Sequence, residues 1–456
     1  MKKCLLLFLA FTGLASANVV LPAIFSDNMV LQRNSEVKIW GWGSPKEEIT
    51  ITTSWNNKEY KTTPNNEANW KLDIRTPEAG GPFEISIKGY NQISLKNILI
   101  GEVWLCSGQS NMEMNASWGI KNGEEETKLA HHPNIRFLSI PKLTSASPQD
   151  NLPANWEECT PETMKYFSAV AYFFALHLQE DLKDVPIGLI NSSWGGTPAE
   201  IWIPEPIIKK DPVLVASANK LNTTEYGPNL PGRAFNAMIN PLAGFKIAGT
   251  IWYQGESNVG AQNYEKTLSS LIKSWREKWN QDFPFYYVQI APYEYGDEHF
   301  GGVEIQDAQR KTLQLVKNTG MAMTSDVATL DDIHPKDKKT VGNRLAEIAL
   351  KKHYKTRNTI AEGPLFKNMD IQKNTISITF ENAQGLYFKN KRTALFEVAG
   401  KDNIFHPAEA SIKNDTITVK SKFVKEPRQV RFAWKNTAQS DLFNSANLPA
   451  SAFRSE

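Results

Sequence analysis

The feature that most constrains the fold is an alternation of buried-strand and helix patterns between residues 98 and 355. Near-continuous apolar runs of strand length occur throughout this region: ILIGEVWLC (98–106), VPIGLIN (185–191), FKIAGTIWY (245–253), PFYYVQIAP (284–292) and GMAMTSD (320–326). Strands that helices cover on both faces have this apolar character. The stretches between the runs repeat apolar residues at three- and four-residue spacing, as in YEKTLSSLIKSWREKWN (264–280). The alternation predicts a parallel, doubly wound α/β domain.

Short β-type segments flank this region on both sides. EVKIWGWG (36–43) before it and TISITF (375–380) after it are typical of many such segments, which are separated by Pro, Gly, Asn and Asp. This pattern predicts a β-sandwich-like region at each end of the chain. We expect an N-terminal β domain over 18–97, a catalytic α/β domain over 98–360 and a C-terminal β-rich domain over 361–456.

The first 17 residues, MKKCLLLFLAFTGLASA, have the three-part form of a secretory signal peptide. Their apolar core is too short to span a bilayer. Cleavage after Ala17 removes Lys2 and Lys3, which leaves 51 − 2 = 49 basic residues against 49 acidic ones. A mature chain with no net formal charge and no basic cluster gives little support to a nucleic-acid or anionic-membrane partner. We expect a secreted or periplasmic protein that does not insert into the membrane.

Cys106 and Cys159 are the cysteines that remain after cleavage. The sequence leaves open whether they form a disulfide or stay as two buried thiols. Their spacing does not suggest a metal site, and no cluster of His, Asp and Glu has ligand spacing. We therefore expect no metal. We also expect no organic cofactor, because the serine chemistry considered below needs none.

Polar residues follow four of the predicted strands. The four segments are SGQSN (107–111), NSSWGG (191–196), QGESN (254–258) and LDDIHP (330–335). Because ligands of an open parallel sheet bind beyond the carboxyl ends of its strands, we expect these segments to converge on one site.

Three serines stand at these strand ends: Ser110, Ser193 and Ser257. None lies in a Gly-x-Ser-x-Gly motif, so the usual nucleophile elbow of the α/β-hydrolases is absent. A serine needs a base to become a nucleophile, and His334 follows a buried strand with carboxylates two and three residues before it. The local sequence favours Ser110, which Gly108 precedes by two residues, without excluding the other two serines.

Four motifs in order, GEVWLCSGQSNM, NSSWGGTPAEIW, GTIWYQGESN and DIHPKDKKTVGNRLA, resemble the sialate O-acetylesterase family of the SGNH hydrolases. LPAIFSDNMVLQR and LFNSANLPASAFR, near the two ends, resemble the same family, so the resemblance covers nearly the whole mature chain. It implies an α/β/α SGNH domain with extra β domains and the removal of acetyl groups from sugars. It also implies that Ser110 is the nucleophile and His334 the base.

The remaining roles follow from that resemblance. Attack on an acetyl ester creates an oxyanion that needs N–H donors. The expected donors are the amide of Ser110, an amide of Gly195 or Gly196, and the Gln254 side chain. SGNH enzymes generally use an asparagine as the third donor, and Asn258 is the alternative to Gln254.

The acid of the triad is expected at Asp331. Many SGNH enzymes place this aspartate three residues before the histidine, whereas the DIHP motif guarantees only Asp332, two residues before it. Adjacent residues of an extended turn point in opposite directions, so we expect at most one of the two to serve, and a Ser–His dyad with no carboxylate is the remaining alternative.

The acetylated sugar is expected to be sialic acid, with xylan or pectin as the alternative. A sialic acid carboxylate needs a cation, for which Arg233 is the candidate. Trp194 and Glu256 are candidates for lining the sugar site. The alternatives are packing for Trp194 and, for Glu256, hydrogen bonds that hold its loop. The chief alternative is a non-catalytic carbohydrate-binding surface protein. The predicted pairing of a nucleophile with a base argues against it, because binding alone needs no such pair.

Overall fold

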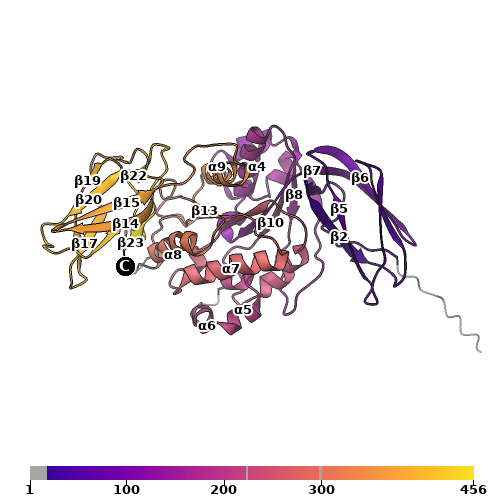
Figure 1. Ribbon diagram of the computed structural model, residues 1–456, viewed down its shortest axis with the longest axis horizontal. Helices are drawn as coiled ribbons and strands as arrows, with labels where there is room; N and C mark the ends of the chain where they lie inside the picture. Colours follow the sequence, from indigo (N-terminus) through magenta and orange to yellow (C-terminus); the bar gives the residue numbers. More distant parts are fainter. Residues whose placement is uncertain (1–17, 222–223, 297–299, 456) are drawn as a thin grey trace, which may run out of the picture.

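The computed structural model describes residues 18–221, 224–296 and 300–455, and the expected signal peptide lies outside them. An N-terminal β region, a central α/β part and a C-terminal β part follow one another along the molecule, with the two β parts at opposite ends (Figure 1).

The large central sheet has the strand order β13-β12-β11-β7-β10-β8-β9 along its main path. Neighbouring strands are parallel from β13 to β8, and the edge pair β8–β9 is antiparallel. The bounds are β7 Gln92–Gly108, β8 His132–Ser139, β9 Trp156–Cys159, β10 Ile187–Ser193, β11 Gly249–Tyr253, β12 Phe285–Val288 and β13 Thr319–Ala322. The predicted α/β class with a largely parallel sheet is confirmed.

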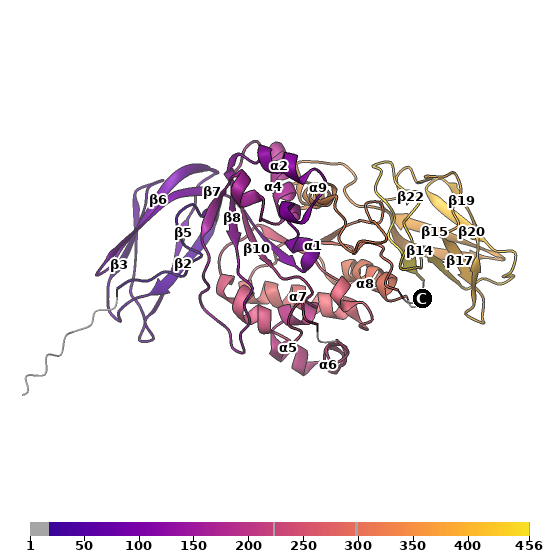
Figure 2. The same ribbon diagram turned by 180° about the vertical axis from the view of Figure 1, so that it is seen from behind.

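Helices cover both faces of this sheet, α4 and α9 on one face and α7 and α8 on the other (Figures 1 and 2). Alternate residues of β7 enter the two cores: Trp104 packs in the α4/α9 core, and Leu105 packs in the α7/α8 core. This alternation is the reason for the continuous apolar runs in the sequence. The helices are α1 Ser110–Glu113, α2 Gly123–Leu129, α3 Pro161–Met164, α4 Ala169–Leu182, α5 Glu205–Lys210, α6 Pro212–Ala218, α7 Tyr264–Trp279, α8 Gly301–Leu315 and α9 Lys338–Ala349.

The N-terminal β region shares a strand with the central sheet. Its own strands are β1 Val30–Gln32, β2 Glu36–Trp42, β3 Ile49–Thr53, β4 Lys58–Thr62, β5 Asn69–Arg75 and β6 Gly80–Lys88. The first half of β7 pairs with β6, with Ile93 opposite Ile87, and its second half pairs with β10, with Leu105 opposite Ile190. The domain boundary expected at residue 97 therefore falls inside a continuous strand.

The C-terminal part contains antiparallel sheets, with the orders β14-β15-β20-β19, β18-β17-β21-β23 and β16-β22. One core joins them, with Ile378 and Ile417 from the first sheet and Val398 and Phe432 from the second. The bounds are β14 Leu365–Gln372, β15 Thr375–Glu381, β16 Tyr387–Phe388, β17 Phe396–Ala399, β18 Phe405–Pro407, β19 Glu409–Lys413, β20 Thr416–Lys420, β21 Gln429–Phe432, β22 Leu442–Phe443 and β23 Phe453–Arg454.

Cys106 and Cys159 are both buried and free. Among residues 18–221, 224–296 and 300–455, no helix is long and apolar enough to cross a membrane. The same residues contain no group of three or more His, Cys, Asp or Glu side chains that could hold a metal ion.

Candidate active site

Ser110 lies at the carboxyl edge of the sheet, where β7 turns abruptly into the short helix α1. Gly108, the last residue of β7, has φ +142°, and a Cβ added there would lie 2.1 Å from the carbonyl oxygen of Tyr253 on β11. That carbonyl accepts a hydrogen bond of 3.0 Å from the Gln109 amide. Only glycine allows this close approach of two strands, and the turn sets Ser110 at the edge.

His334 reaches the same edge from the loop between β13 and α9. Its Nε2 atom lies 2.8 Å from Ser110 Oγ, which is hydrogen-bond distance between a hydroxyl and a ring nitrogen. The hydroxyl of Ser193 instead donates to Asn191 Oδ1 at 2.9 Å. Among the described residues, no histidine forms a hydrogen bond with Ser193 or Ser257. The structure thus brings together Ser110 and His334, the pair that the sequence favours.

Asp332, not Asp331, lies beside His334. The Asp332 Oδ1 atom is 3.7 Å from His334 Nδ1 and accepts a hydrogen bond of 2.9 Å from the His334 amide. Asp331 is exposed, and within the described part of the chain its side chain makes no hydrogen bond or ion pair. This arrangement does not support Asp331 as the acid, because the turn directs the neighbouring carboxylate toward the ring.

The environment of His334 favours its neutral form. Partial burial of the ring lowers its pKa below the ordinary value, and the positive charge of Lys338 lowers it further, while Asp332 acts in the opposite direction. A neutral imidazole accepts a proton from a hydroxyl, so the lowered pKa suits a general base.

Several of the N–H groups expected to donate to an oxyanion already donate to other acceptors. The Gly195 amide donates a hydrogen bond of 2.7 Å to Glu113 Oε2, so it already has an acceptor. The Gln254 side chain is fully buried, and its Nε2 atom donates to Asn258 Oδ1 at 2.7 Å. Asn258 Nδ2 in turn donates to Glu200. The structure therefore argues against Gln254 and Asn258 as oxyanion donors and assigns them to a buried network behind the site.

Glu256 belongs to a buried polar cluster that includes Asn111, the residue after Ser110. Its Oε1 atom accepts a hydrogen bond of 2.5 Å from Asn111 Nδ2, and Asn111 Oδ1 accepts one of 2.5 Å from Lys338 Nζ. Asn111 Nδ2 also donates to the carbonyl of Ile333 at 3.0 Å, next to the histidine. Burial raises the pKa of Glu256 and lowers the pKa of Lys338 to about 7. Glu256 is therefore a supporting residue, and its expected place against a sugar is not supported.

The other two residues expected to bind the sugar differ in position. Trp194 follows β10, and its amide donates to the carbonyl of Gly108 at 3.0 Å, so it lies close to the turn before Ser110. Trp194 is half-buried and packs against the α7/α8 core. At the start of α5 the pKa of Glu205 is lowered, first by a hydrogen bond from Lys209 and also by the charge of Arg233. Within the described residues, Arg233 forms no hydrogen bond or ion pair with Ser110 or His334.

Sequence reasoning missed several residues near this pair. Asn111 and Lys338 stand within the recognised motifs, directly after Ser110 and four residues after His334. Trp118 and Tyr226 are exposed aromatic residues that lie near the site and belong to no motif. Their exposure is a tertiary property, which one sequence does not reveal.

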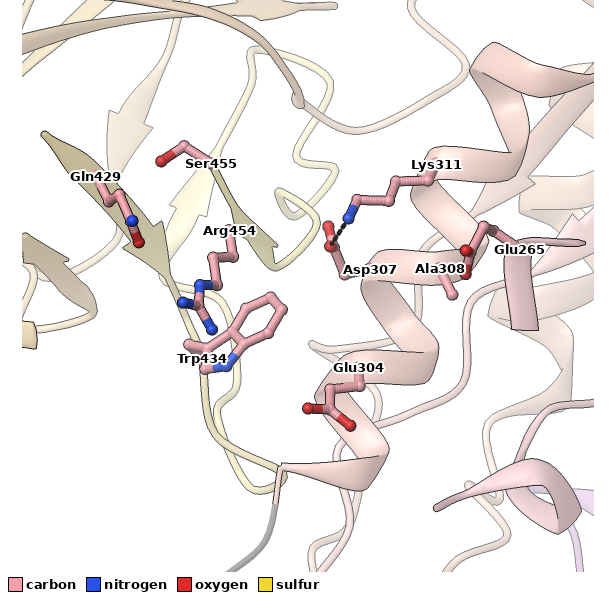
Figure 3. Close-up of a pocket in the computed structure, with 9 residues that line it drawn as sticks. All are labelled: Glu265, Glu304, Asp307, Ala308, Lys311, Gln429, Trp434, Arg454 and Ser455. Carbon is pink, nitrogen blue, oxygen red and sulfur yellow. Dashed lines mark ion pairs between the residues drawn. The ribbon is translucent and has the colours of Figure 1, made fainter. Parts of the chain in front are cut away.

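A separate cavity of about 440 Å³ lies between α8 and the C-terminal sheets (Figure 3). Charged side chains line it, including Glu304, Arg454 and an ion pair of 3.3 Å between Lys311 and Asp307. Neither Ser110 nor His334 lines it, so we do not assign ester chemistry to this cavity.

Comparison with known proteins shows which family this chain resembles. The family model described as "Carbohydrate esterase, sialic acid-specific acetylesterase" matches residues 100–351. The sialate O-acetylesterase of Homo sapiens is 30% identical over 414 residues, which span 82% of this chain and 78% of that protein. The sialate O-acetylesterase of Mus musculus is 29% identical over 443 residues, spanning 83% and 81%. The crystal structure of a carbohydrate acetylesterase from Xanthomonas citri superposes with a TM-score of 0.87 at 32% identity, covering 96% of this chain and 99% of that one.

A protein with this fold and these relatives is a hydrolase of carboxylic esters. More particularly, the chain belongs to the sialic acid-specific acetylesterase family of carbohydrate esterases, as the resemblance of its motifs implied.

Proposed function

We propose that this chain is a secreted or periplasmic serine esterase of the SGNH type that removes O-acetyl groups from sialic acid. The observation that carries the proposal is the distance of 2.8 Å between Ser110 Oγ and His334 Nε2 at the carboxyl edge of a parallel sheet. Membership of the acetylesterase family supports the choice of an acetyl ester on a sugar.

The first half of the reaction acylates the serine. His334 Nε2 takes the proton of Ser110 as the oxygen attacks the acetyl carbonyl, forming a tetrahedral intermediate with a negatively charged oxygen. The amide of Ser110, at the start of α1, is a proposed donor to that oxygen. Collapse of the intermediate breaks the bond to the sugar oxygen, which leaves with the proton held by His334. The product of this step is an acetyl-serine.

The second half reverses these roles with water. His334 takes a proton from water, the resulting hydroxide attacks the acetyl-serine, and Ser110 recovers its proton as acetate leaves. We assign to Asp332 the part of the carboxylate that holds the tautomer of His334 and stabilises the imidazolium. Its distance of 3.7 Å from Nδ1 is longer than a hydrogen bond, and such contacts often shorten when substrate binds.

Acetate release from O-acetylated sialic acid, acetylated xylan and acetylated pectin, measured side by side, tests this function. We expect release from the sialic acid ester and its abolition in Ser110→Ala. The smaller side chain at this half-buried position gives no reason for unfolding. Ser193→Ala is the matched control and should keep wild-type turnover. Release from xylan or pectin alone would overturn the proposed substrate, and an active Ser110→Ala would overturn the nucleophile.

Secretion rests on the signal-peptide pattern of residues 1–17. Expression of the full chain in a bacterium with a periplasm, followed by N-terminal sequencing of the purified protein, tests it. The expected first residue is Asn18. An intact N-terminus beginning at Met1 would contradict export.

A further inference from the structure

Two exposed aromatic residues lie near the Ser110–His334 pair. Trp118 packs edge-on against His334, with ring centroids 6.4 Å apart and an interplanar angle of 84°. Tyr226 lies against Gly196, where an added Cβ would be 2.6 Å from Tyr226 Cβ. Trp118 is 44% exposed and Tyr226 is 71% exposed.

Gly195 connects the Tyr226 contact to the serine. A Cβ added to Gly195 would lie 3.3 Å from Ser110 Cβ, so the Gly195–Gly196 turn lies directly against Ser110. The contacts therefore run from Trp118 through His334, Ser110 and this turn to Tyr226. Trp118 and Tyr226 therefore stand at the two ends of this series of contacts, which includes Ser110 and His334.

These two aromatic residues differ from the others at the sheet edge. Trp252 and Tyr253, which precede the QGESN segment, are 0% exposed and pack in the core. Large aromatic side chains left in water forfeit much of the stabilisation that burial would give them. Exposure of two of them beside one catalytic pair is therefore better explained by a ligand than by packing.

The backbone holds Trp118 in place before any ligand arrives. It ends a 3₁₀ turn, Ala116–Trp118, whose capping residue Asn115 accepts a hydrogen bond of 3.1 Å from the Ser117 amide. Gly119 closes the turn in the left-handed conformation. Within the described part of the chain, the indole N–H of Trp118 makes no hydrogen bond, which leaves a donor beside an apolar face.

We propose that Trp118 and Tyr226 form the subsite that binds the sugar ring carrying the scissile acetyl ester. This inference rests on the proposed function and specifies its substrate contacts. A pyranose ring has an apolar face of C–H groups and an edge of hydroxyl groups. An exposed aromatic residue with a polar tip matches both parts, covering the face and reaching the edge. Burial of one such side chain corresponds to about tenfold to hundredfold in affinity.

Two esters with the same acetyl group separate sugar binding from chemistry. The probes are O-acetylated sialic acid, which has the ring, and p-nitrophenyl acetate, which has no sugar. Trp118→Ala and Tyr226→Ala should each lower kcat/KM for the sialic acid ester by about tenfold to hundredfold, mainly through KM. The loss on the sugar ester should exceed the loss on p-nitrophenyl acetate at least tenfold. Trp118→Phe, which keeps a ring, should recover much of the lost affinity.

Tyr90→Ala is the matched control, because Tyr90 is 61% exposed but belongs to the N-terminal β region. Tyr90→Ala should leave kcat/KM unchanged for both esters. Equal losses on both esters in Trp118→Ala and Tyr226→Ala, or no loss on the sugar ester, would overturn the subsite while leaving the proposed function intact. A wild-type protein that hydrolyses p-nitrophenyl acetate but releases no acetate from the sugar would overturn the proposed function itself.

Discussion

Lys338 Nζ donates a hydrogen bond of 2.5 Å to Oδ1 of Asn111, the residue that directly follows Ser110. Lys338 is only 1% exposed, and Asn111 is 0% exposed. Asn111 forms hydrogen bonds with three groups that are distant from it in the sequence: the Lys338 amine on α9, the Glu256 carboxylate and the Ile333 carbonyl. One amide therefore ties the loop that carries His334 to the turn that carries Ser110.

Asn111→Ala should destabilise the fold and lower kcat. The change removes three hydrogen bonds and leaves a buried amine and a buried carboxylate without this partner. A buried donor or acceptor that loses its hydrogen-bond partner costs about 1–3 kcal/mol. Urea unfolding measures the loss of stability, and acetate release at a temperature where the variant stays folded measures kcat.

Asn444→Ala is the control for that experiment. Asn444 is also 0% exposed and makes several hydrogen bonds, but it lies in the C-terminal part. We expect it to lower stability without lowering the kcat of the folded protein. A wild-type kcat in folded Asn111→Ala would show that this side chain has no positioning role.

The pH profile of kcat/KM should rise through a pKa below the ordinary histidine value. In the proposed mechanism His334 must be neutral to accept the serine proton, and burial and the charge of Lys338 both lower its pKa. Lys338→Met removes a positive charge that disfavours the imidazolium, so the rising limb should move to higher pH. Measurement of kcat/KM between about pH 4 and 8 in both proteins checks the direction of the shift.

Lys339→Met serves as the charge-matched control for this shift. Lys339 neighbours Lys338 in the chain, but it pairs at the surface with Glu126 at 2.8 Å, and its side chain is 53% exposed. The rising limb of the pH profile of Lys339→Met should lie at the same pH as that of the wild type. A downward shift in Lys338→Met would contradict the electrostatic role given to the buried lysine.

The long buried strands were predictable from the sequence, whereas the edge strands were not. Strands β10 and β11 coincide with apolar runs because helices cover both of their faces. In contrast, β9 is only WEEC, and β14 is mostly exposed, so neither has a long apolar run or a clear alternation. Their pairing depends on a neighbour that is distant in the sequence.

The same distinction applies to the site. The convergence of the polar segments followed from a general rule about strand ends, whereas the choice of Ser110 among three serines followed from the family resemblance. The choice between Asp331 and Asp332 depends on the direction of one turn, and the burial of Gln254 depends on partners such as Tyr264, which come from other elements. Such details are set by tertiary contacts that spacing alone does not encode.

Gly108→Ala should be strongly destabilising. The added methyl group would lie 2.1 Å from the Tyr253 carbonyl oxygen, and the φ of +142° is unfavourable for a residue with a side chain. Backbone strain of this kind costs about 1–3 kcal/mol, to which the steric clash adds. Gly119→Ala is the control, since its φ is +83° and nothing lies within 4 Å of an added Cβ. Urea unfolding of both variants should show a much larger loss in Gly108→Ala, and similar losses would contradict the close approach of the two strands.

Asp332→Asn and Asp331→Asn distinguish the carboxylate that supports His334. Only Asp332 lies near the ring, with Oδ1 3.7 Å from Nδ1. Asparagine keeps an oxygen that can still accept the hydrogen bond from the His334 amide, so the loop should keep its shape. The negative charge that stabilises the imidazolium is lost, and removal of such a partner lowers kcat by up to about 10⁴-fold.

We expect Asp332→Asn to lower kcat by about 10²- to 10⁴-fold. Its unfolding midpoint should stay close to that of the wild type. Asp331→Asn changes an exposed side chain and should lose less than about threefold. The rising limb of the pH profile offers a second readout. Asp332 raises the pKa of His334, so replacing Asp332 by a neutral asparagine should move this limb to lower pH. A large loss in Asp331→Asn alone would restore the aspartate three residues before the histidine as the acid, and small losses in both variants would indicate a Ser–His dyad.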